Sequence, residues 1–168
     1  MQSTKTLIHA FVSSHLDYCN ALLFGLPKYQ LDRLQKIQNA AARVTFQIAK
    51  FDHITPALID LHWLLVTFRV QLKLLLFVYK SISDQTPSYI SDLLSMKPAA
   101  NYALRSSAKY LFFVSKVNCS TLGDGAFAHA APVLWNSLPL TIKTSSSFAI
   151  FKKQLKTFFL KKAFNLLE

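Results

Sequence analysis

The sequence contains few acidic residues and few cysteines. Only 8 of its 168 residues are acidic, and Glu168 is the single glutamate. The aspartates do not pair closely along the chain, which argues against a two-metal carboxylate site for phosphoryl transfer. The two cysteines, Cys19 and Cys119, lie too far apart for a C-x-x-C metal pair, and two alone make no disulfide framework. We therefore expect a reducing, intracellular compartment, either nuclear or cytoplasmic.

Glycine is also scarce, with only 3 in the chain. The segment Gly123-Asp124-Gly125 lacks the third glycine and the following Lys-Ser/Thr of a phosphate loop, so it predicts a turn. The histidine spacings do not place two ligands on one helical face, which argues against zinc. The N-terminus has no signal-peptide pattern, so we do not expect secretion. We expect no metal, no cofactor and no catalytic activity from this chain alone.

Basic and apolar residues are abundant. The chain has 19 Lys and Arg residues and a formal net charge of +11, which suits a polyanion such as nucleic acid or an anionic membrane surface. Hydrophobic residues make up 52% and charged residues 16%, and there are 14 phenylalanines. The chain therefore has few polar residues to cover its surface. Either a partner covers an exposed apolar patch, or the domain is unusually well buried.

The hydrophobic periodicity predicts a mainly α-helical bundle with a small β-hairpin in the C-terminal half. Aromatic and β-branched residues over 109–117 predict one hairpin strand, with its partner near residues 120–122. The predicted helices cover residues 4–24, 30–49, the stretch from Pro56 to about residue 83, 88–95, 124–137 and 148–166. The predicted domains are a helical lobe (1–95), a connection (96–108) and a tail lobe (109–168).

Residues 61–79 are apolar enough to raise the question of a membrane span. Arg69 and Lys73 would lie near its middle at a high energetic cost, and with His62 and Lys80 they form one narrow stripe. We therefore expect a central helix packed within the protein, and no membrane partner.

The segment "SSHLDYCN" gathers several reactive residue types, but it fits a capping pattern. Ser14-His15-Leu16-Asp17 matches [ST]-x-x-[DE], so we expect Asp17 to bond backbone N–H groups at a helix start. Cys19 is then expected to face the interior as a small hydrophobic residue.

Basic side chains are the best functional candidates. Within residues 30–49, Leu31, Leu34, Ile37, Ala41, Val44 and Ile48 are expected to face inward. Lys36, Arg43 and Lys50 recur every seven residues on the other face, at about 10 Å, and Arg33 borders them. A second basic group contains Lys152, Lys153 and Lys156, followed by Lys161 and Lys162. Both groups could contact a phosphate backbone, or they could be ordinary solvated helix faces.

Several sequence blocks together resemble one family of proteins. The blocks include "AFVSSHLDYCNALLFGLP", "LQKIQNAAARV", "FDHITPALIDLHWLLV", "LGDGAFAHAAPVLWNSLP" and "FKKQLKTFF". They resemble, in order and over nearly the whole chain, the C-terminal thumb and post-polymerase region of reverse transcriptases encoded by jockey-like LINE (non-LTR) retrotransposons.

The resemblance implies a non-catalytic part of an RNA-directed DNA polymerase, whose endonuclease and catalytic aspartates lie upstream. It implies RNA or an RNA–DNA duplex as a partner, and an upstream polymerase domain in cis or in trans. The chain contains no Y-x-D-D motif, and Met1 is expected to start inside a longer ancestral reading frame. The alternatives are a helical protein-interaction module and a non-functional relic of a transposable element.

The chain departs from the family pattern at two positions. Leu65 stands where the family usually has proline, and we expect this change to let the central helix continue without a break. Gly125 stands where the family has arginine, which removes a potential contact to a phosphate or a carboxylate.

Overall fold

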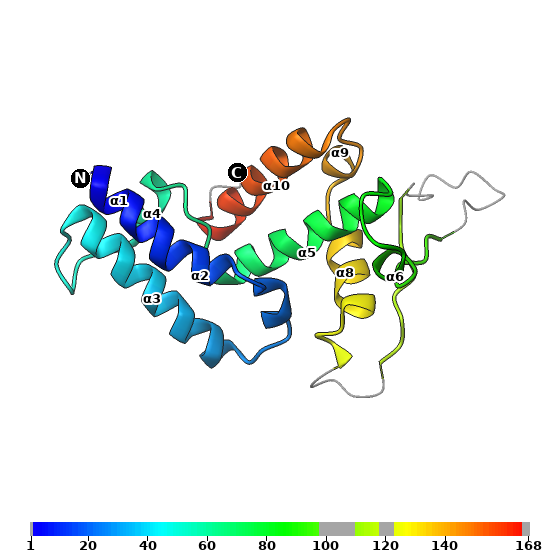
Figure 1. The fold of residues 1–168 in the computed structure, drawn as a ribbon, viewed down its shortest axis with the longest axis horizontal. Coiled ribbons are helices and arrows are strands. Elements are labelled where there is room, and N and C mark those ends of the chain that lie inside the picture. Colours follow the sequence, from blue (N-terminus) through cyan, green and yellow to red (C-terminus); the bar gives the residue numbers. More distant parts are fainter. Residues whose placement is uncertain (1, 98–109, 118–122, 166–168) are drawn as a thin grey trace. The chain divides into compact units, whose positions relative to one another are not determined.

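The computed structural model describes residues 2–97, 110–117 and 123–165, and over these ranges it confirms a mainly helical chain (Figure 1). A π-helical turn (His9–Ser13) and a 3-10 turn (Asn20–Leu23) accompany the α-helices. The α-helices are α1 (Gln2–Ile8), α2 (Ser14–Asp17), α3 (Lys28–Phe46), α4 (Thr55–Asp60), α5 (Val66–Ile82), α6 (Ser88–Ser91), α8 (Phe127–Asn136), α9 (Leu140–Lys143) and α10 (Phe148–Ala163).

The chain forms two compact units. The first contains Met1–Val70 together with Lys156–Glu168, and the second contains Gln71–Leu155. The units therefore divide the chain within α5 and within α10. The predicted lobes, 1–95 and 109–168, have other boundaries and stay a prediction, since most of the predicted connection lies outside the described residues.

Ser13-Ser14 is a position where the sequence could have predicted a break in the helix 4–24, but the N-terminal helix of the first unit continues through it. The π-helical turn joins α1 directly to α2, and α1 lies beside α3. The break comes later, where Tyr18 is extended and Cys19 takes a left-handed φ of 48°. This turn leaves Cys19 exposed, so the prediction of an inward-facing Cys19 is wrong.

The buried face of α3 differs from the predicted one. Ile37 and Val44 were expected to face inward, but they are 51% and 61% exposed. Only Ala41 of the predicted inward set is buried in this helix, and it lies beside Gln38, Ala42 and Thr45. The polar residues on this face make internal hydrogen bonds, so hydrophobicity alone could not identify it.

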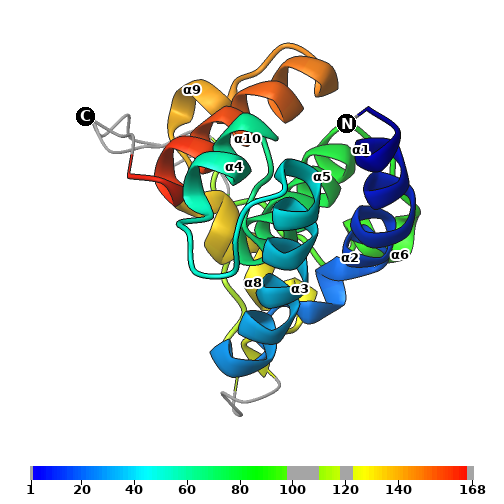
Figure 2. The same cartoon turned by 90° about the vertical axis from the view of Figure 1, so that its left-hand side faces the viewer.

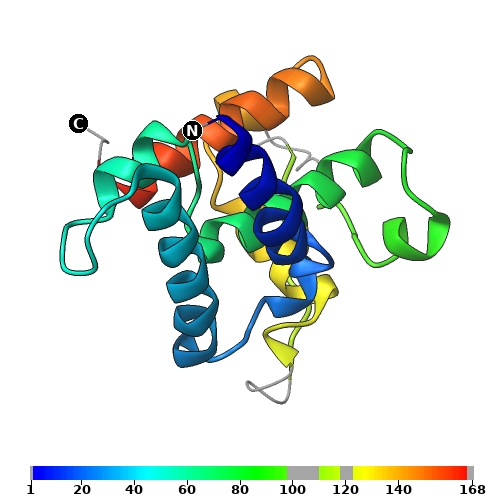
Figure 3. The same ribbon diagram turned by 60° about the vertical axis from the view of Figure 1, so that its left-hand side comes forward.

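The chain breaks between α4 and α5, so the expected uninterrupted central helix is wrong. The loop 47–54 leads from α3 into α4 (Figure 3). His62 then has a positive φ of 52° and ends the turn after α4. Two α3 side chains stabilise the break: Gln38 Nε2 donates to the Leu64 carbonyl at 2.8 Å, and Gln35 Oε1 accepts from the Val66 N–H at 2.9 Å. These bonds satisfy backbone groups that a continuous helix would satisfy itself.

Aromatic side chains dominate the core of the second unit. Trp135 of α8 lies 6.0 Å from Phe112 and 5.8 Å from Phe151 between ring centroids. Tyr79 of α5 stacks on Phe151 at 4.3 Å, and its hydroxyl donates to the Ser145 carbonyl at 3.0 Å. Trp135, Phe112 and Phe151 are the largest of the fully buried side chains in the described part of the chain.

The predicted β-hairpin is not observed, since residues 110–117 form no regular strand and the predicted partner at 120–122 lies outside the described residues. Instead, Phe112 forms one isolated antiparallel bridge with Met96. On its other side, the Asn136 amide accepts from the Phe112 N–H and donates to its carbonyl, both at 3.0 Å. An α8 side chain therefore replaces the second strand.

The prediction for the last helix is confirmed on its main points. Ser147 accepts a hydrogen bond from the Ile150 N–H at 3.3 Å, as expected of a capping serine. Five apolar residues of this helix are expected from their spacing to face inward: Phe148, Phe151, Leu155, Phe158 and Phe159. Phe151, Leu155 and Phe159 are buried, and Phe148 and Phe158 are half-buried. The four-residue spacing of these side chains gives α10 one continuous apolar face.

Candidate functional site

Arg33 and Lys36 of α3 are the predicted cations that the structure leaves most available. Both side chains are exposed, and neither forms an ion pair within the described part of the chain. Asp32 is the only acidic residue of α3. This helix therefore presents a net positive face in the first unit.

Arg43 has a structural contact that the sequence did not predict. Its Nε donates to the Ala49 carbonyl at 3.3 Å, and its Nη2 donates to the Asp52 carbonyl at 3.0 Å. The guanidinium thus holds the loop that follows α3. It remains only partly available to a ligand.

Lys50 does not continue the predicted seven-residue stripe. Helix α3 ends at Phe46, and Gln47 takes a left-handed φ of 52° as its C-cap. Lys50 lies beyond this cap, with its Nζ 5.7 Å from the centroid of the Phe51 ring. A stripe along one helix face requires a continuous helix, so Lys36, Arg43 and Lys50 form no such stripe.

The lysines of α10 are exposed as expected. Lys152 and Lys153 fall in the second unit, whereas Lys156 falls in the first with Lys161 and Lys162. No acidic residue occurs in Phe148–Ala163. The exposed side of this helix is therefore positive along its length.

Lys143 of α9 is an exception among the cations because it is buried. Its Nζ donates to the Asn136 carbonyl at the C-terminus of α8, at 3.1 Å. Burial lowers the pKa of Lys143, because the protein interior solvates the charged amine less well than water. This lysine supports the fold and does not contribute to the exposed basic surface.

The prediction that Asp17 caps a helix start is also wrong. Asp17 is the last residue of α2, and its carboxylate binds Arg69 Nη1 of α5 at 2.9 and 3.0 Å. Arg69 Nε also donates to the Leu64 carbonyl at 3.0 Å. The Arg69 side chain is only 12% exposed. It belongs to a hydrogen-bond network that stabilises the α4–α5 break and does not form a solvent-exposed face of α5.

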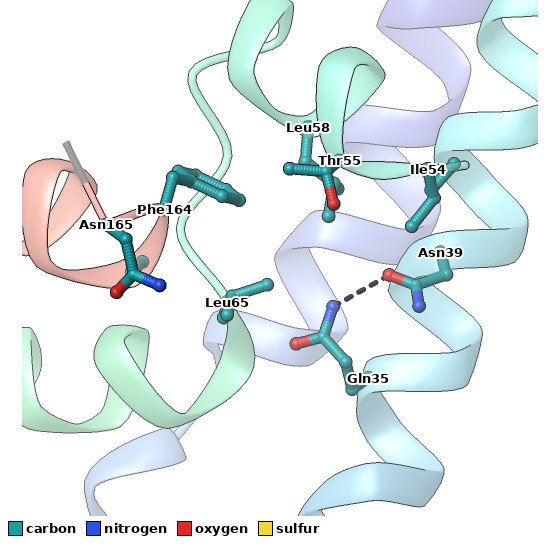
Figure 4. Close-up of a pocket in the computed structure, with 9 residues that line it drawn as sticks. Gln35, Asn39, Ile54, Thr55, Leu58, Leu65, Phe164 and Asn165 are labelled. Atoms are coloured by element: carbon teal, nitrogen blue, oxygen red, sulfur yellow. Dashed lines mark hydrogen bonds between the residues drawn. The ribbon is translucent and has the colours of Figure 1, made fainter.

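The α4–α5 break borders a pocket of about 320 Å³ in the first unit. In this unit α4 lies beside the last turn of α10 (Figure 2). Figure 4 shows side chains of α3, α4 and the end of α10 around the same space. The lining residues are Gln35, Asn39, Ile54, Thr55, Leu58, Leu65, Ala163, Phe164 and Asn165.

The pocket lining is uncharged, with an apolar wall and several amides. Gln35 Nε2 donates to Asn39 Oδ1 at 2.8 Å, while its Oε1 accepts from Val66 (Figure 4). The sequence analysis did not identify this pair, although an amide pair at i, i+4 is a recognisable helix signal. Thr55 and Asn165 could not have been identified, because only the fold brings them to α3.

Within residues 2–97, 110–117 and 123–165, no three His, Cys, Asp or Glu side chains come together in a way that could hold a metal ion. None of the helices in these ranges combines the length and apolar character that a membrane span requires.

A comparison with known proteins found no protein-family model, no curated protein and no solved structure that matches this chain.

Proposed function

We propose that this chain is a non-catalytic helical module that binds the backbone of RNA or of an RNA–DNA duplex. The observation that supports this proposal best is the positive charge of α10, which carries five lysines and no acidic residue. Arg33 and Lys36 add a second exposed basic face on α3. Cations on rigid helices bind phosphates without reading sequence, and this contact supplies most of non-specific affinity.

We also propose, from the sequence resemblance, that the module corresponds to the C-terminal region of a non-LTR retrotransposon reverse transcriptase. In that setting it would hold the template or primer duplex while a polymerase domain, in cis or in trans, performs the chemistry. The proposed contacts are Arg33, Lys36, Lys152, Lys153 and Lys156. Arg43 and Lys50 are secondary contacts, because Arg43 bonds the loop after α3 and Lys50 lies beyond the end of this helix.

The test is fluorescence anisotropy with a short RNA–DNA duplex at several salt concentrations. Each lost phosphate contact makes the slope of log K against log salt shallower by about 1. We expect Arg33→Ala/Lys36→Ala to make the slope shallower by about 2, and Lys152→Ala/Lys156→Ala to do the same.

The matched control is Lys97→Ala/Lys116→Ala, which removes the same charge from exposed residues outside both helices. It should change the slope by less than either double variant. Affinity that does not vary with salt, or equal effects of all three double variants, would contradict the proposed contacts.

A second candidate function is a helical protein-interaction module, and one observation favours it. Leu7, Phe11 and Tyr18 of the N-terminal helical segment are 57%, 66% and 81% exposed. Leu7 and Phe11 are four residues apart in the helical segment and Tyr18 directly follows it, and large exposed apolar side chains that lie together commonly mark an interface. This function predicts association that is insensitive to salt and oligomers whose size grows with protein concentration in analytical ultracentrifugation.

A further inference from the structure

The pocket of the first unit differs chemically from the basic surfaces. None of its nine lining residues carries a charge. An uncharged site gives no compensation for a buried phosphate, so a phosphate is a poor occupant. A volume of about 320 Å³ lies at the small end of ligand sites and suits a single ring system.

The apolar part of the pocket comes from three separate segments. Ile54 and Leu58 lie at and within α4, Leu65 precedes α5, and Phe164 follows α10. Figure 4 shows the Phe164 ring and the leucine side chains directed toward the same space. An aromatic ring with aliphatic neighbours favours a flat apolar group, and aromatic side chains commonly stack with unpaired bases.

The Val66 backbone N–H determines which side-chain atoms of Gln35 and Asn39 donate and which accept hydrogen bonds. The Val66 N–H can only donate, so Gln35 must present Oε1 to it and Nε2 to Asn39. Asn39 must therefore accept with Oδ1, which leaves its Nδ2 as a donor. In the described part of the chain this Nδ2 has no hydrogen-bond partner, and Asn39 is one of the residues that line the pocket.

Exposed lysines lie next to pocket-lining residues in the sequence. Lys36 follows Gln35 in α3, and Lys161 and Lys162 precede Ala163 in α10. Two of the helices that contribute to the pocket or to its rim, α3 and α10, therefore carry exposed lysines. This arrangement suits a ligand with an uncharged ring and attached phosphates.

We propose that this pocket takes one unstacked uracil base of a single-stranded RNA, with its O4 accepting from Asn39 Nδ2. This inference rests on the proposed nucleic-acid function and adds a base preference to it. At the position where uracil carries O4, a carbonyl acceptor, cytosine carries an N4 amine donor. The Asn39 donor therefore favours uracil over cytosine.

The test compares labelled oligo-uridine and oligo-cytidine heptamers by fluorescence anisotropy on the full chain. One net hydrogen bond corresponds to about fivefold in affinity, so we expect the chain to bind oligo-uridine about fivefold more tightly. Asn39→Ala should remove this preference by weakening oligo-uridine alone. Ala163→Phe, which fills the pocket and leaves the Gln35–Asn39 bond intact, should remove it as well.

Gln30→Ala is the matched control, because Gln30 belongs to α3 but does not line the pocket. It should keep the preference. Equal affinity for the two heptamers, together with a steep salt dependence, would contradict base binding in the pocket. The same result would still support the phosphate contacts. A preference that survives both pocket variants would overturn the pocket assignment, and salt-independent binding would overturn the proposed function itself.

Discussion

Three polar residues show how side chains organise the first unit. Gln35, Gln38 and Arg69 converge on the short stretch Leu64–Val66, where each satisfies a backbone group that the α4–α5 break exposes. Gln38 is fully buried in doing so. A buried amide destabilises the fold unless it is hydrogen-bonded. These three residues therefore support the structure, although their polar side chains suggest surface positions.

The Asp17–Arg69 ion pair gives a prediction at this scale. Serine caps helices well but cannot pair with arginine, so Asp17→Ser separates the two roles. We expect this variant to lower the free energy of unfolding by about 1 kcal/mol, since Asp17 is 51% exposed and the pair is partly screened. Urea denaturation measures the change.

Arg69→Met supplies the second arm of a double-mutant cycle for this pair. In the Arg69→Met background, Asp17→Ser should cost little further stability, because its partner is already gone. An undiminished effect in that background would show that Asp17 stabilises the fold through a contact other than the one with Arg69.

At the level of elements, the extended segment at 110–113 depends on a helix for its hydrogen bonds. Its neighbour on one side is the short stretch 95–97, through Lys97 N–H to Leu111 O and Phe113 N–H to Ser95 O, both at 2.8 Å. On the other side the Asn136 side chain bonds both backbone groups of Phe112. Trp135 Nε1 adds a bond to the Tyr110 carbonyl at 2.8 Å. Consecutive α8 residues thus fix an extended segment without a second strand.

Replacement of Asn136 tests this role. Asn136→Ala leaves the N–H and carbonyl of the buried Phe112 without these bonds, which costs about 2–3 kcal/mol for the two groups together. We expect this loss in urea denaturation, with faster hydrogen exchange at the Phe112 amide. Asn136→Asp keeps the acceptor but loses the donor, and should also be destabilising. Unchanged exchange in Asn136→Ala would contradict the role.

At the level of the whole molecule, the two compact units share two helices. The boundary between the units falls at Val70 in α5 and at Leu155 in α10. Helix formation is cooperative along its length, so a unit that unfolds destabilises the helical turns that the other unit uses. We therefore expect the chain to unfold in one transition.

The two tryptophans allow this expectation to be measured, because Trp63 lies in the first unit and Trp135 in the second. Trp63→Phe and Trp135→Phe each leave one fluorescent reporter. Within each variant, the fluorescence midpoint in urea should coincide with the circular dichroism midpoint, as two-state unfolding requires. Separate midpoints would show that the units unfold independently.

The sequence alone determined the helical class, the positive charge and most of the apolar face of α10, and it placed the cap of this helix at Ser146 or Ser147. These features depend on the spacing of residues within one helix or on adjacent residues, so local periodicity and capping chemistry suffice to predict them. The lysines of α10 were likewise exposed as expected, because the buried positions of that helix fix the opposite face.

Only the tertiary structure decided which face of α3 is buried, what Asp17 and Arg43 bind, and where the pocket lies. Each of these features joins residues far apart in the sequence, as Gln38 with Leu64 and Asp17 with Arg69. A polar side chain has no fixed preference for burial until a partner is placed beside it. The periodicity of α3 was therefore insufficient to predict its buried face, because the partners of its polar residues come from other elements of the fold.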